Sequence, residues 1–360
     1  MNATSEIRIT ELEIPARVGE RGWDDFATAI AIHYGNEALV YGTDELAFTA
    51  EETLPNYLDQ EHEPTRLFAA WDGKRMVGAA RYEIEPGDDP HTSWLMVDVL
   101  PGVRQQGIGT ALSAKLQGVA ATDGIRKAIV YTVSGFGQGQ QLCAPTGFGS
   151  VAADNSEVKF LLRAGYRLEQ VVRASRLPLP APGAETMLAR SRVAAGDDFV
   201  LHTWVDRTPK KWRREMAAMH QAMSVEEPTA GLEEPEDVWT IRRLDETEKR
   251  LAGGPRRFLV TAVEHVPSAT LAGFTTLSVP TELDRPVTQE DTLVLPAYRG
   301  HRLGMLLKAA NLEELRQRFD PRPSVITFNA EENRHMLNVN EQLGFAPIGY
   351  EGAWRRDLPN

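Results

Sequence analysis

The stretch Val97-Asp-Val-Leu-Pro-Gly-Val-Arg-Gln-Gln-Gly-Ile-Gly-Thr-Ala-Leu112 decides the fold of the first half of the chain. Its β-branched run ends at Pro101, which has no N–H group and cannot continue a strand ladder. From Ile108 onward, apolar residues recur at helical spacing. Gly107 and Gly109 allow a ligand to approach the backbone closely where this helix begins. Because the first N–H groups of a helix have no internal partner, the strand–turn–helix predicts an anion site suited to phosphate.

A second copy of this stretch, Thr292-Leu-Val-Leu-Pro-Ala-Tyr-Arg-Gly-His-Arg-Leu-Gly-Met-Leu-Leu-Lys308, lies later in the chain. Residues 68–132 can be laid on residues 263–327 without a gap, at a shift of 195 residues. Self-similarity at one long offset predicts a domain duplication rather than a solenoid. Arg302 stands where the first copy has Gly107, and we interpret it as a tolerated variant that can clamp phosphate. A decayed site is the alternative.

The duplication predicts two domains, as does the length of 360 residues, which exceeds the usual limit for one core. Three prolines within Leu177-Pro-Leu-Pro-Ala-Pro-Gly183 disfavour both helix and interior strand. We therefore expect an N-terminal domain at 1–177, a linker at 178–192 and a C-terminal domain at 193–360. Each half follows the order strand, helix, hairpin, strand, helix, strand, helix. The fold class expected is α/β (α+β), with a mostly antiparallel mixed sheet flanked by helices in each domain.

Composition excludes several classes of partner. The formal charge of −12 argues against a nucleic-acid footprint, which needs clustered Lys and Arg. Cys143 is the only cysteine, so no intramolecular disulfide can form. The first residues are charged throughout, unlike a secretory signal, and no stretch reaches the roughly 18 apolar residues of a membrane span. We expect a cytoplasmic protein with no membrane partner and no metal site, and leave its oligomeric state open between monomer and homodimer.

The segment Arg104-Gln-Gln-Gly-Ile-Gly109 behind a Val-x-Val-x-Pro strand end resembles the Arg/Gln-x-x-Gly-x-Gly/Ala signature of the GNAT superfamily of N-acetyltransferases. The two copies resemble the tandem members of that family, such as mycothiol synthase-like enzymes. The resemblance implies that acetyl-CoA is the cofactor, with its pyrophosphate at the turn and its pantetheine arm along the preceding strand. The cofactor-binding residues implied are Val97, Val99, Arg104, Gln105, Gln106, Gly107, Ile108, Gly109 and Thr110 in the first copy, and Leu293, Val294, Leu295, Arg299, Gly300, His301, Arg302, Leu303, Gly304, Met305, Asn329 and Asn333 in the second.

The resemblance also implies transfer of an acetyl group to a primary amine of a small molecule. The family's usual acid is a tyrosine four residues before the last helix-terminal glycine, and Leu161 and Asn340 occupy that position here. Neither can act as an acid. We expect Asp291 and Glu290 as candidate bases and Tyr350 as a further candidate catalytic group. A solvated strand end is the alternative for both carboxylates.

Several interpretations stay open. We favour the second half as the catalytic one, with the first half binding CoA or serving as scaffold. Capping of the last helix is an alternative role for Asn333. The glycine-rich residues 133–149 can be a lid over an acceptor pocket or a plug between domains. Because both tyrosines are missing, a non-catalytic acyl-CoA-binding or sensor protein is the main alternative to an enzyme. A protein whose turns only pack helices on sheets is the third.

Overall fold

The computed structural model describes residues 7–85, 90–137 and 139–358. The chain divides into two compact units. Unit 1 comprises Met1–Val172, Thr229–Pro235 and Gly349–Asn360, and unit 2 comprises Arg173–Pro228 and Glu236–Ile348. The expected linker forms no separate segment, because most of it is helix α5 (Ala184–Ala195), which packs on helix α8 (Leu303–Arg318) of unit 2.

Unit 1 is built on a mixed sheet in which strands follow the order β1-β2-β3-β4-β5-β14. Their bounds are Arg8–Glu11 (β1), Thr65–Asp72 (β2), Arg75–Ile84 (β3), Thr92–Val99 (β4), Lys127–Ser134 (β5) and Ala346–Asp357 (β14). All neighbours run antiparallel except β4 and β5, which are parallel. The helices are α1 (Trp23–Tyr41), α2 (Ala50–Tyr57), α3 (Ile108–Thr122) and α4 (Ser156–Arg163). The expected hairpin through Asp72 and Gly73 is confirmed.

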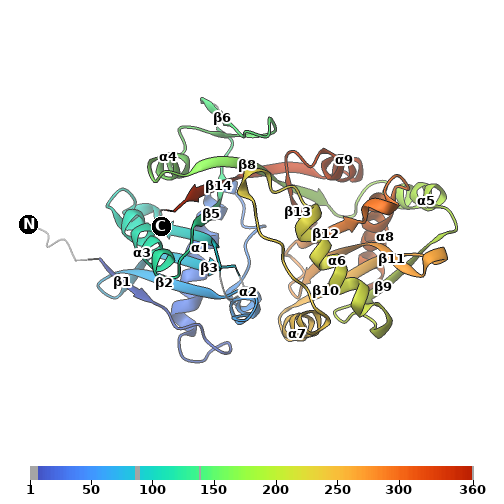
Figure 1. Cartoon of the computed structure of the whole chain (residues 1–360), viewed down its shortest axis with the longest axis horizontal. Helices are drawn as coiled ribbons and strands as arrows, with labels where there is room; N and C mark the ends of the chain where they lie inside the picture. The colour runs from blue at the N-terminus through green and yellow to red at the C-terminus, as the bar shows by residue number, and fades with distance from the viewer. Residues whose placement is uncertain (1–6, 86–89, 138, 359–360) are drawn as a thin grey trace, which may run out of the picture. The chain divides into compact units, whose positions relative to one another are not determined.

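Alternation along β2 and β3 sends side chains to both faces of this sheet. Phe68 and Val77 pack with α3 and α4 in one core, whereas Leu67 and Ala79 pack with α1 and α2 in another. Figure 1 shows the two helix layers on opposite faces. The glycine-rich insertion forms a small two-stranded sheet of β6 (Gln141–Cys143) and β7 (Ser150–Ala152). It belongs to unit 1.

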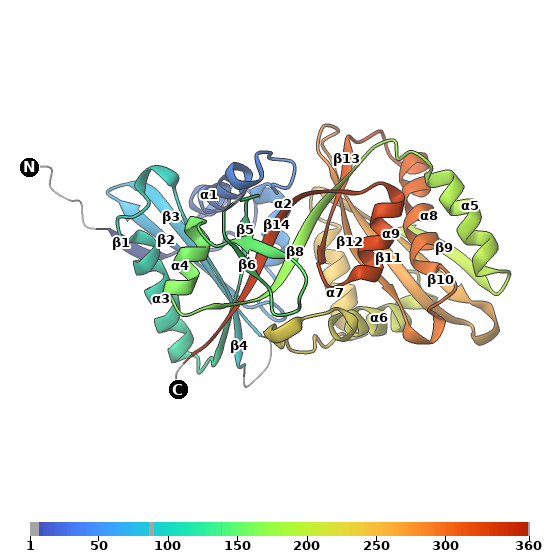
Figure 2. The same cartoon turned by 90° about the horizontal axis from the view of Figure 1, so that it is seen from above.

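Unit 2 repeats this plan with strands in the order β13-β12-β11-β10-β9. The bounds are Phe199–Val205 (β9), Arg256–His265 (β10), Thr270–Pro280 (β11), Val287–Val294 (β12) and Ser324–Ala330 (β13). Helices α6 (Arg213–Glu226) and α7 (Ile241–Leu251) cover one face, while α5, α8 and α9 (Arg334–Leu343) cover the other. Figure 2 shows α8 and α9 beside the strands that they cover. Strand β8 (Arg167–Pro178) carries the chain from unit 1 into unit 2.

Each unit has a glycine at the same position of its sheet, where close packing leaves no room for a side chain. A Cβ on Gly78 would lie 2.8 Å from the carbonyl oxygen of Asp98, and a Cβ on Gly273 would lie 2.4 Å from that of Leu293. In each unit the glycine pairs with the last residue of the following strand, Val99 or Val294. The repeat seen in the sequence is therefore a repeat in space.

The last strand differs from the expected division of the chain. Residues Tyr350–Asp357 of β14 pair with Ser134–Lys127 of β5, so the end of the chain completes the sheet of unit 1. Trp354 of this strand is fully buried in the core of unit 1. The short segment Thr229–Pro235 also joins unit 1, where Leu232 packs against Ile129 and Ala353.

Candidate functional site

Both strand–turn–helix copies hold the same backbone geometry with a different placement of glycine. In the first turn, Gln105 and Gly107 have positive φ angles of 63° and 85°. In the second, the equivalent positions are Gly300 and Arg302, with φ angles of 91° and 57°. Each turn thus uses glycine at one left-handed position and an ordinary residue at the other. The departure at Arg302 leaves the turn geometry intact.

Each turn presents a helix N-terminus that no side chain caps. The N-cap residues are Gly107 for α3 and Arg302 for α8, and neither helix has a side-chain hydrogen bond at its cap. Nothing lies within 4 Å of where a Cβ would be on Gly107, Gly300 or Gly304. The free N–H groups and the helix dipole therefore face open space, which suits a phosphate group. The residues present fit the diphosphate of a CoA thioester.

The two signature arginines are held by the protein. Arg104 donates from Nε to the carbonyl oxygen of Val99 (3.0 Å) and from Nη2 to Oδ1 of Asn36 (2.9 Å). Arg299 donates from Nε to the carbonyl oxygen of Val294 (3.3 Å) and forms an ion pair with Glu226 (2.6 Å). Each arginine thus ties the turn to the strand before it and to a helix on the opposite face. A direct contact with phosphate stays a prediction.

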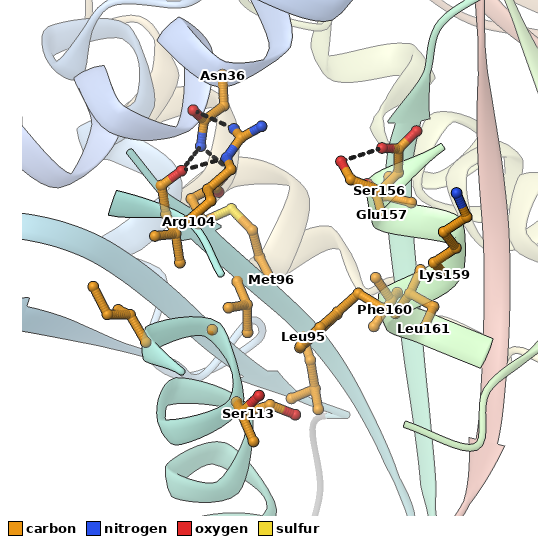
Figure 3. Close-up of a pocket in the computed structure, with 18 of the residues that line it drawn as sticks. Asn36, Leu95, Met96, Arg104, Ser113, Ser156, Glu157, Lys159, Phe160 and Leu161 are labelled. Carbon is orange, nitrogen blue, oxygen red and sulfur yellow. Dashed lines mark hydrogen bonds between the residues drawn. The ribbon is translucent and has the colours of Figure 1, made fainter. Parts of the chain in front are cut away.

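A parallel strand pair separates beside each turn and opens a cavity. β4 and β5 pair only from Thr92 to Trp94, and β12 and β13 pair only at Val287 and Thr288. Beyond these residues the strands diverge, which leaves backbone groups available to an extended ligand such as a pantetheine arm. The cavity of unit 1 has a volume of about 890 Å³, and that of unit 2 about 740 Å³. Figure 3 shows the first, between α3, α4 and the end of β4.

A polar cluster lines the cavity of unit 1. Asp98 accepts a hydrogen bond from Nδ2 of Asn36 (2.9 Å) and lies 2.9 Å from Nδ1 of His33. The Nε2 atom of His33 is 3.5 Å from Glu37, one helical turn further along α1. Asp98 is therefore an ordered partner of a histidine rather than a solvated strand carboxylate. The spacing of His33, Asn36 and Glu37 within the second half of α1 is the sequence signal that our prediction overlooked.

Burial and neighbouring charges alter the acidity of this cluster. Burial alone would lower the pKa of His33, but the charge and hydrogen bond of Asp98 raise it overall. Burial raises the pKa of Glu37, and the charge of Asp98 adds to the effect. On β14, burial and the nearby Glu37 raise the pKa of Glu351 to about 7, although Tyr41 donates a 2.8 Å hydrogen bond to it. The cluster holds groups that can exchange protons near neutral pH.

In unit 2 a β-bulge brings two carboxylates to the cavity. The pairing of β11 with β12 shifts between Thr275 and Leu277, so that Glu290 and Asp291 together face Thr276. Bulges re-aim side chains and are common beside active sites. Glu290 and Asp291 both line the cavity. Glu290 is exposed to solvent in the open cavity, and the protein around it together with the charge of Asp291 raises its pKa to about 7.

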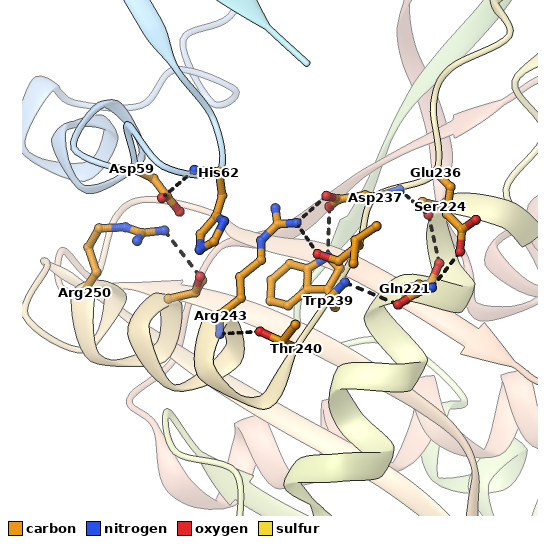
Figure 4. A network of polar contacts seen from close by, with 12 residues as sticks. Asp59, His62, Gln221, Ser224, Glu236, Asp237, Trp239, Thr240, Arg243 and Arg250 are labelled. Carbon is orange, nitrogen blue, oxygen red and sulfur yellow. Dashed lines mark hydrogen bonds and ion pairs between the residues drawn. The ribbon is translucent and has the colours of Figure 1, made fainter. Parts of the chain in front are cut away.

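A histidine faces the bulge from α6. The Nδ1 atom of His220 lies 3.6 Å from Asp291, and its ring stacks on Trp239 at 4.6 Å. Asp237 accepts a hydrogen bond from the indole of Trp239 (2.8 Å) and pairs with Arg243, as Figure 4 shows. These contacts fix the indole and hence the ring of His220. Each unit thus places a histidine from a covering helix beside an aspartate of the strand before the turn.

Most of the predicted site residues line one of the two cavities. Those in unit 1 are Val97, Val99, Arg104, Gln105, Gly107, Ile108, Gly109 and Thr110. Those in unit 2 are Leu293, Val294, Arg299, Gly300, Arg302, Leu303, Gly304, Met305, Asn329 and Asn333, besides Glu290 and Asp291. The lining of either cavity does not include Gln106, Leu295, His301 or Tyr350.

The placement of Tyr350 differs from our expectation for the second half. Tyr350 pairs with Ser134 of β5 and packs on Phe136 with ring centroids 5.5 Å apart, so it belongs to unit 1. Its position in the sequence is misleading because the last strand crosses to the sheet of unit 1. His301 is also turned away from the cavity, since its ring packs on Phe199 at 5.1 Å.

The asparagines of unit 2 have structural partners. Asn333 is the N-cap of α9 and accepts a hydrogen bond from the backbone N–H of Met336 (3.2 Å), so its capping role is confirmed. Asn329 accepts a hydrogen bond from Nδ2 of Asn340 (2.7 Å). Asn340 is buried, and its Oδ1 atom has no hydrogen-bond partner. The position of the family's tyrosine thus holds an amide that orients Asn329.

Comparison with known proteins agrees with this architecture. Residues 37–139 match the family model described as "Acetyltransferase (GNAT) family". A tandem GNAT protein from the clavulanic acid biosynthesis pathway, solved without AcCoA, is 23% identical with a TM-score of 0.74 and 99% of both chains covered. A GCN5-related N-acetyltransferase from Sphaerobacter thermophilus is 15% identical, with a TM-score of 0.59 and 93% of this chain and 92% of that chain covered. Saccharomyces cerevisiae N-myristoyltransferase with bound myristoyl-CoA is 10% identical, with a TM-score of 0.56 and coverages of 99% and 81%. A search of curated proteins gives no significant match.

Residues 37–139 thus match a GNAT acetyltransferase domain, and the chain as a whole has the fold of tandem GNAT proteins. Its first half carries the matched GNAT domain, and its whole length has the tandem GNAT fold. Proteins of this family generally use acetyl-CoA as the acyl donor. Among the described residues, no helix is both long enough and apolar enough to cross a bilayer.

Proposed function

We propose that the chain transfers an acetyl group from acetyl-CoA to a primary amine of a small molecule, and that unit 2 carries the catalytic site. The observation that supports this proposal most directly is the bulge of β12. It places Glu290, a carboxyl group with a pKa of about 7, in the same cavity as the uncapped N-terminus of α8. A general base works best when its pKa is close to the working pH.

The donor would be held by the turn and the separated strands. The backbone N–H groups at Leu303 and Gly304 are suited to the diphosphate, and the edge of β12 at Leu293 and Val294 is suited to the pantetheine amides. The bound donor supplies a thioester whose carbonyl carbon is the electrophile. Asn329, oriented by Asn340, is placed to hydrogen-bond the arm.

The catalytic carboxylate would act on the acceptor amine. Glu290 takes a proton from the amine, so that its nitrogen can form the new C–N bond as the C–S bond breaks. The departing sulfur leaves as a thiolate, which water protonates, because Asn340 stands at the position of the usual acid. Asp291, which lines the cavity beside Glu290 and lies 3.6 Å from Nδ1 of His220, would orient the amine.

The charges around the cavity favour a cationic acceptor. Four carboxylates line it, namely Glu226, Glu227, Glu290 and Asp291. Arg299, Arg302 and Lys308 line the turn and the helix after it, so the negative charge available to attract an ammonium substrate is that of Glu290 and Asp291 on β12. Unit 1 has acid–base groups of its own, because Asp98 is in contact with His33 and Asn36 in its cavity. Unit 1 is therefore the second candidate for the catalytic half.

Amine-dependent release of CoA thiol tests the proposal. The matched variants are Gly109→Trp and Gly304→Trp, which place an indole at equivalent helix starts, each lining its own cavity. We expect Gly304→Trp to abolish thiol release from acetyl-CoA with a panel of small amines, while Gly109→Trp retains it. Loss with Gly109→Trp alone would move the chemistry to unit 1. Acetyl-CoA binding without thiol release at any amine concentration would instead favour the acyl-CoA sensor.

A further inference from the structure

The wall of the unit 2 cavity contains a buried lysine. Lys308 of α8 lines the cavity and is only 2% exposed. Among the described residues it forms no hydrogen bond or ion pair, and its one recorded contact is with the ring of Phe345, 5.9 Å from the ammonium nitrogen. Lysine is almost never fully buried unless it is paired. No residue that the structure describes supplies a counter-charge to this amine.

Burial without a partner makes the charged form costly. Desolvation lowers the pKa of Lys308 to about 7, so that both the amine and the ammonium form are populated near neutral pH. A bound anion would reverse this effect, because opposite charge at close range favours the ammonium form. The state of Lys308 thus depends on what occupies the cavity.

The position of Lys308 on the helix indicates which anion. Lys308 follows Gly304 by four residues, so both lie on the same face of α8. Side chains on a helix lean toward its N-terminus, and Gly304 has no side chain and open space where one would be. The stem of Lys308 can therefore extend over Gly304 toward the uncapped N–H groups at the start of α8. These are the groups suited to a diphosphate.

The equivalent position in unit 1 carries no cation. It is Ser113, which lines the unit 1 cavity (Figure 3). Its hydroxyl group accepts a hydrogen bond from Gln117 at 3.2 Å. The two cavities share the turn geometry and the uncapped helix, but only that of unit 2 has a buried amine behind the turn. The difference predicts that the two cavities respond differently to pH.

Other ionisable groups share the cavity with Lys308. They are Glu290 and Asp291 on β12, Arg299 and Arg302 at the turn, His335 on α9, and Glu226 and Glu227 at the end of α6. None of them is recorded in an ion pair with Lys308, and the ionisable residues of α5 do not line the cavity. Glu290 can also change its proton occupancy when an anion binds, so the test must separate it from Lys308.

We propose that Lys308 is the counter-charge for the diphosphate of an acyl-CoA bound in unit 2, and that this cavity takes up a proton when the donor binds. The inference rests on the proposed function, because it assigns the donor to this cavity. It goes beyond it by naming a positioning residue for the phosphates and a proton uptake through a lysine that unit 1 does not have at the equivalent position, Ser113.

Calorimetric titration of CoA at pH 8 in buffers of different ionisation enthalpy measures this linkage. The Gly109→Trp background closes the cavity of unit 1, and Lys308→Met is compared with the parent. We expect the parent to take up most of one proton per CoA, because an amine with a pKa of about 7 is mostly neutral at pH 8. Lys308→Met should lose that uptake and bind CoA roughly 10- to 100-fold more weakly, as expected for a lost charge-assisted hydrogen bond.

Three control variants and two control ligands separate the possible causes. Glu290→Gln and His335→Asn should retain the proton uptake, and the exposed Lys115→Met on α3 should leave both uptake and affinity unchanged. Pantetheine, which lacks phosphate, should bind equally well to the parent and to Lys308→Met. Dephospho-CoA, which keeps the diphosphate but lacks the 3′-phosphate, should behave like CoA.

The outcomes distinguish this inference from the function it rests on. If CoA binds and Lys308→Met neither weakens binding nor reduces proton uptake, the inference is wrong while the donor site stands. If dephospho-CoA loses the dependence on Lys308, the diphosphate assignment is wrong. If folded protein binds no CoA in the Gly109→Trp background, the proposed function of unit 2 fails instead.

Discussion

At the scale of single residues, the two turns show that a backbone conformation can be kept while its glycine moves. Gln105 and Arg302 occupy left-handed positions that cost an ordinary residue roughly 1–2 kcal/mol. Gly107 and Gly300 carry the other left-handed position of each turn without that cost. Since each turn retains one glycine, the conformational cost of a left-handed residue arises only once in each turn. The conformation of the first turn is thus kept in the second with Arg302 in place of glycine, as our interpretation of a tolerated variant requires.

Substitution of Gly300 tests this argument. Gly300→Ala forces a Cβ into a φ of 91° where nothing lies within 4 Å, so only backbone strain changes. We expect a loss of roughly 1–2 kcal/mol in the free energy of unfolding, measured by urea denaturation. Gly102→Ala is the matched control, because Gly102 has open space and no left-handed φ, and the second copy carries Ala297 there. An equal loss in both variants would contradict the argument.

At the scale of elements, a single extra residue in β12 separates the chemistry of the two cavities. β4 pairs with β3 in one continuous register from Ser93 to Val99, whereas the bulge in β12 turns Glu290 and Asp291 toward the cavity. In unit 1 the carboxylate beside the turn, Asp98, is instead held by His33 and Asn36. The equivalent strands β12 and β4 therefore differ: β12 presents Glu290 as a candidate base, whereas β4 presents Asp98 in contact with His33.

The pH dependence of transfer follows from the bulge. A base must be deprotonated to work, so kcat/KM should rise with pH through about 7, where Glu290 ionises. Glu290→Gln should remove that ionisation and lower kcat by roughly 10²- to 10⁴-fold. Steady-state thiol release between pH 5.5 and 9 measures both effects. Glu227→Gln, which also lies in the cavity wall, should keep the rise near pH 7, and its loss there would shift the role of base to Glu227.

At the scale of the whole molecule, the sequence predicts what local patterns encode and misses what distant pairing decides. Pro101, Gly107 and the helical spacing after Ile108 predict the strand–turn–helix, and the structure confirms it in both copies. The sequence does not predict which sheet the strand of Tyr350 joins, because apolar and polar residues alternate along a final strand in the same way in either sheet. The bulge at Glu290 escaped prediction for a similar reason, since a register shift depends on the partner strand.

The crossing of the last strand gives the final prediction. Trp354 is fully buried in the core of unit 1, although it lies near the end of the second half of the sequence. Replacement of a buried tryptophan by alanine typically costs about 3–5 kcal/mol. We expect Trp354→Ala to accelerate hydrogen exchange in β2 and β3 of unit 1, while β10 and β11 of unit 2 keep their protection. Trp204→Ala, in the core of unit 2, is the matched variant and should give the reverse pattern. Faster exchange of β10 and β11 in Trp354→Ala would show that the last strand stabilises unit 2, and that the division of the chain into these two units does not describe its unfolding.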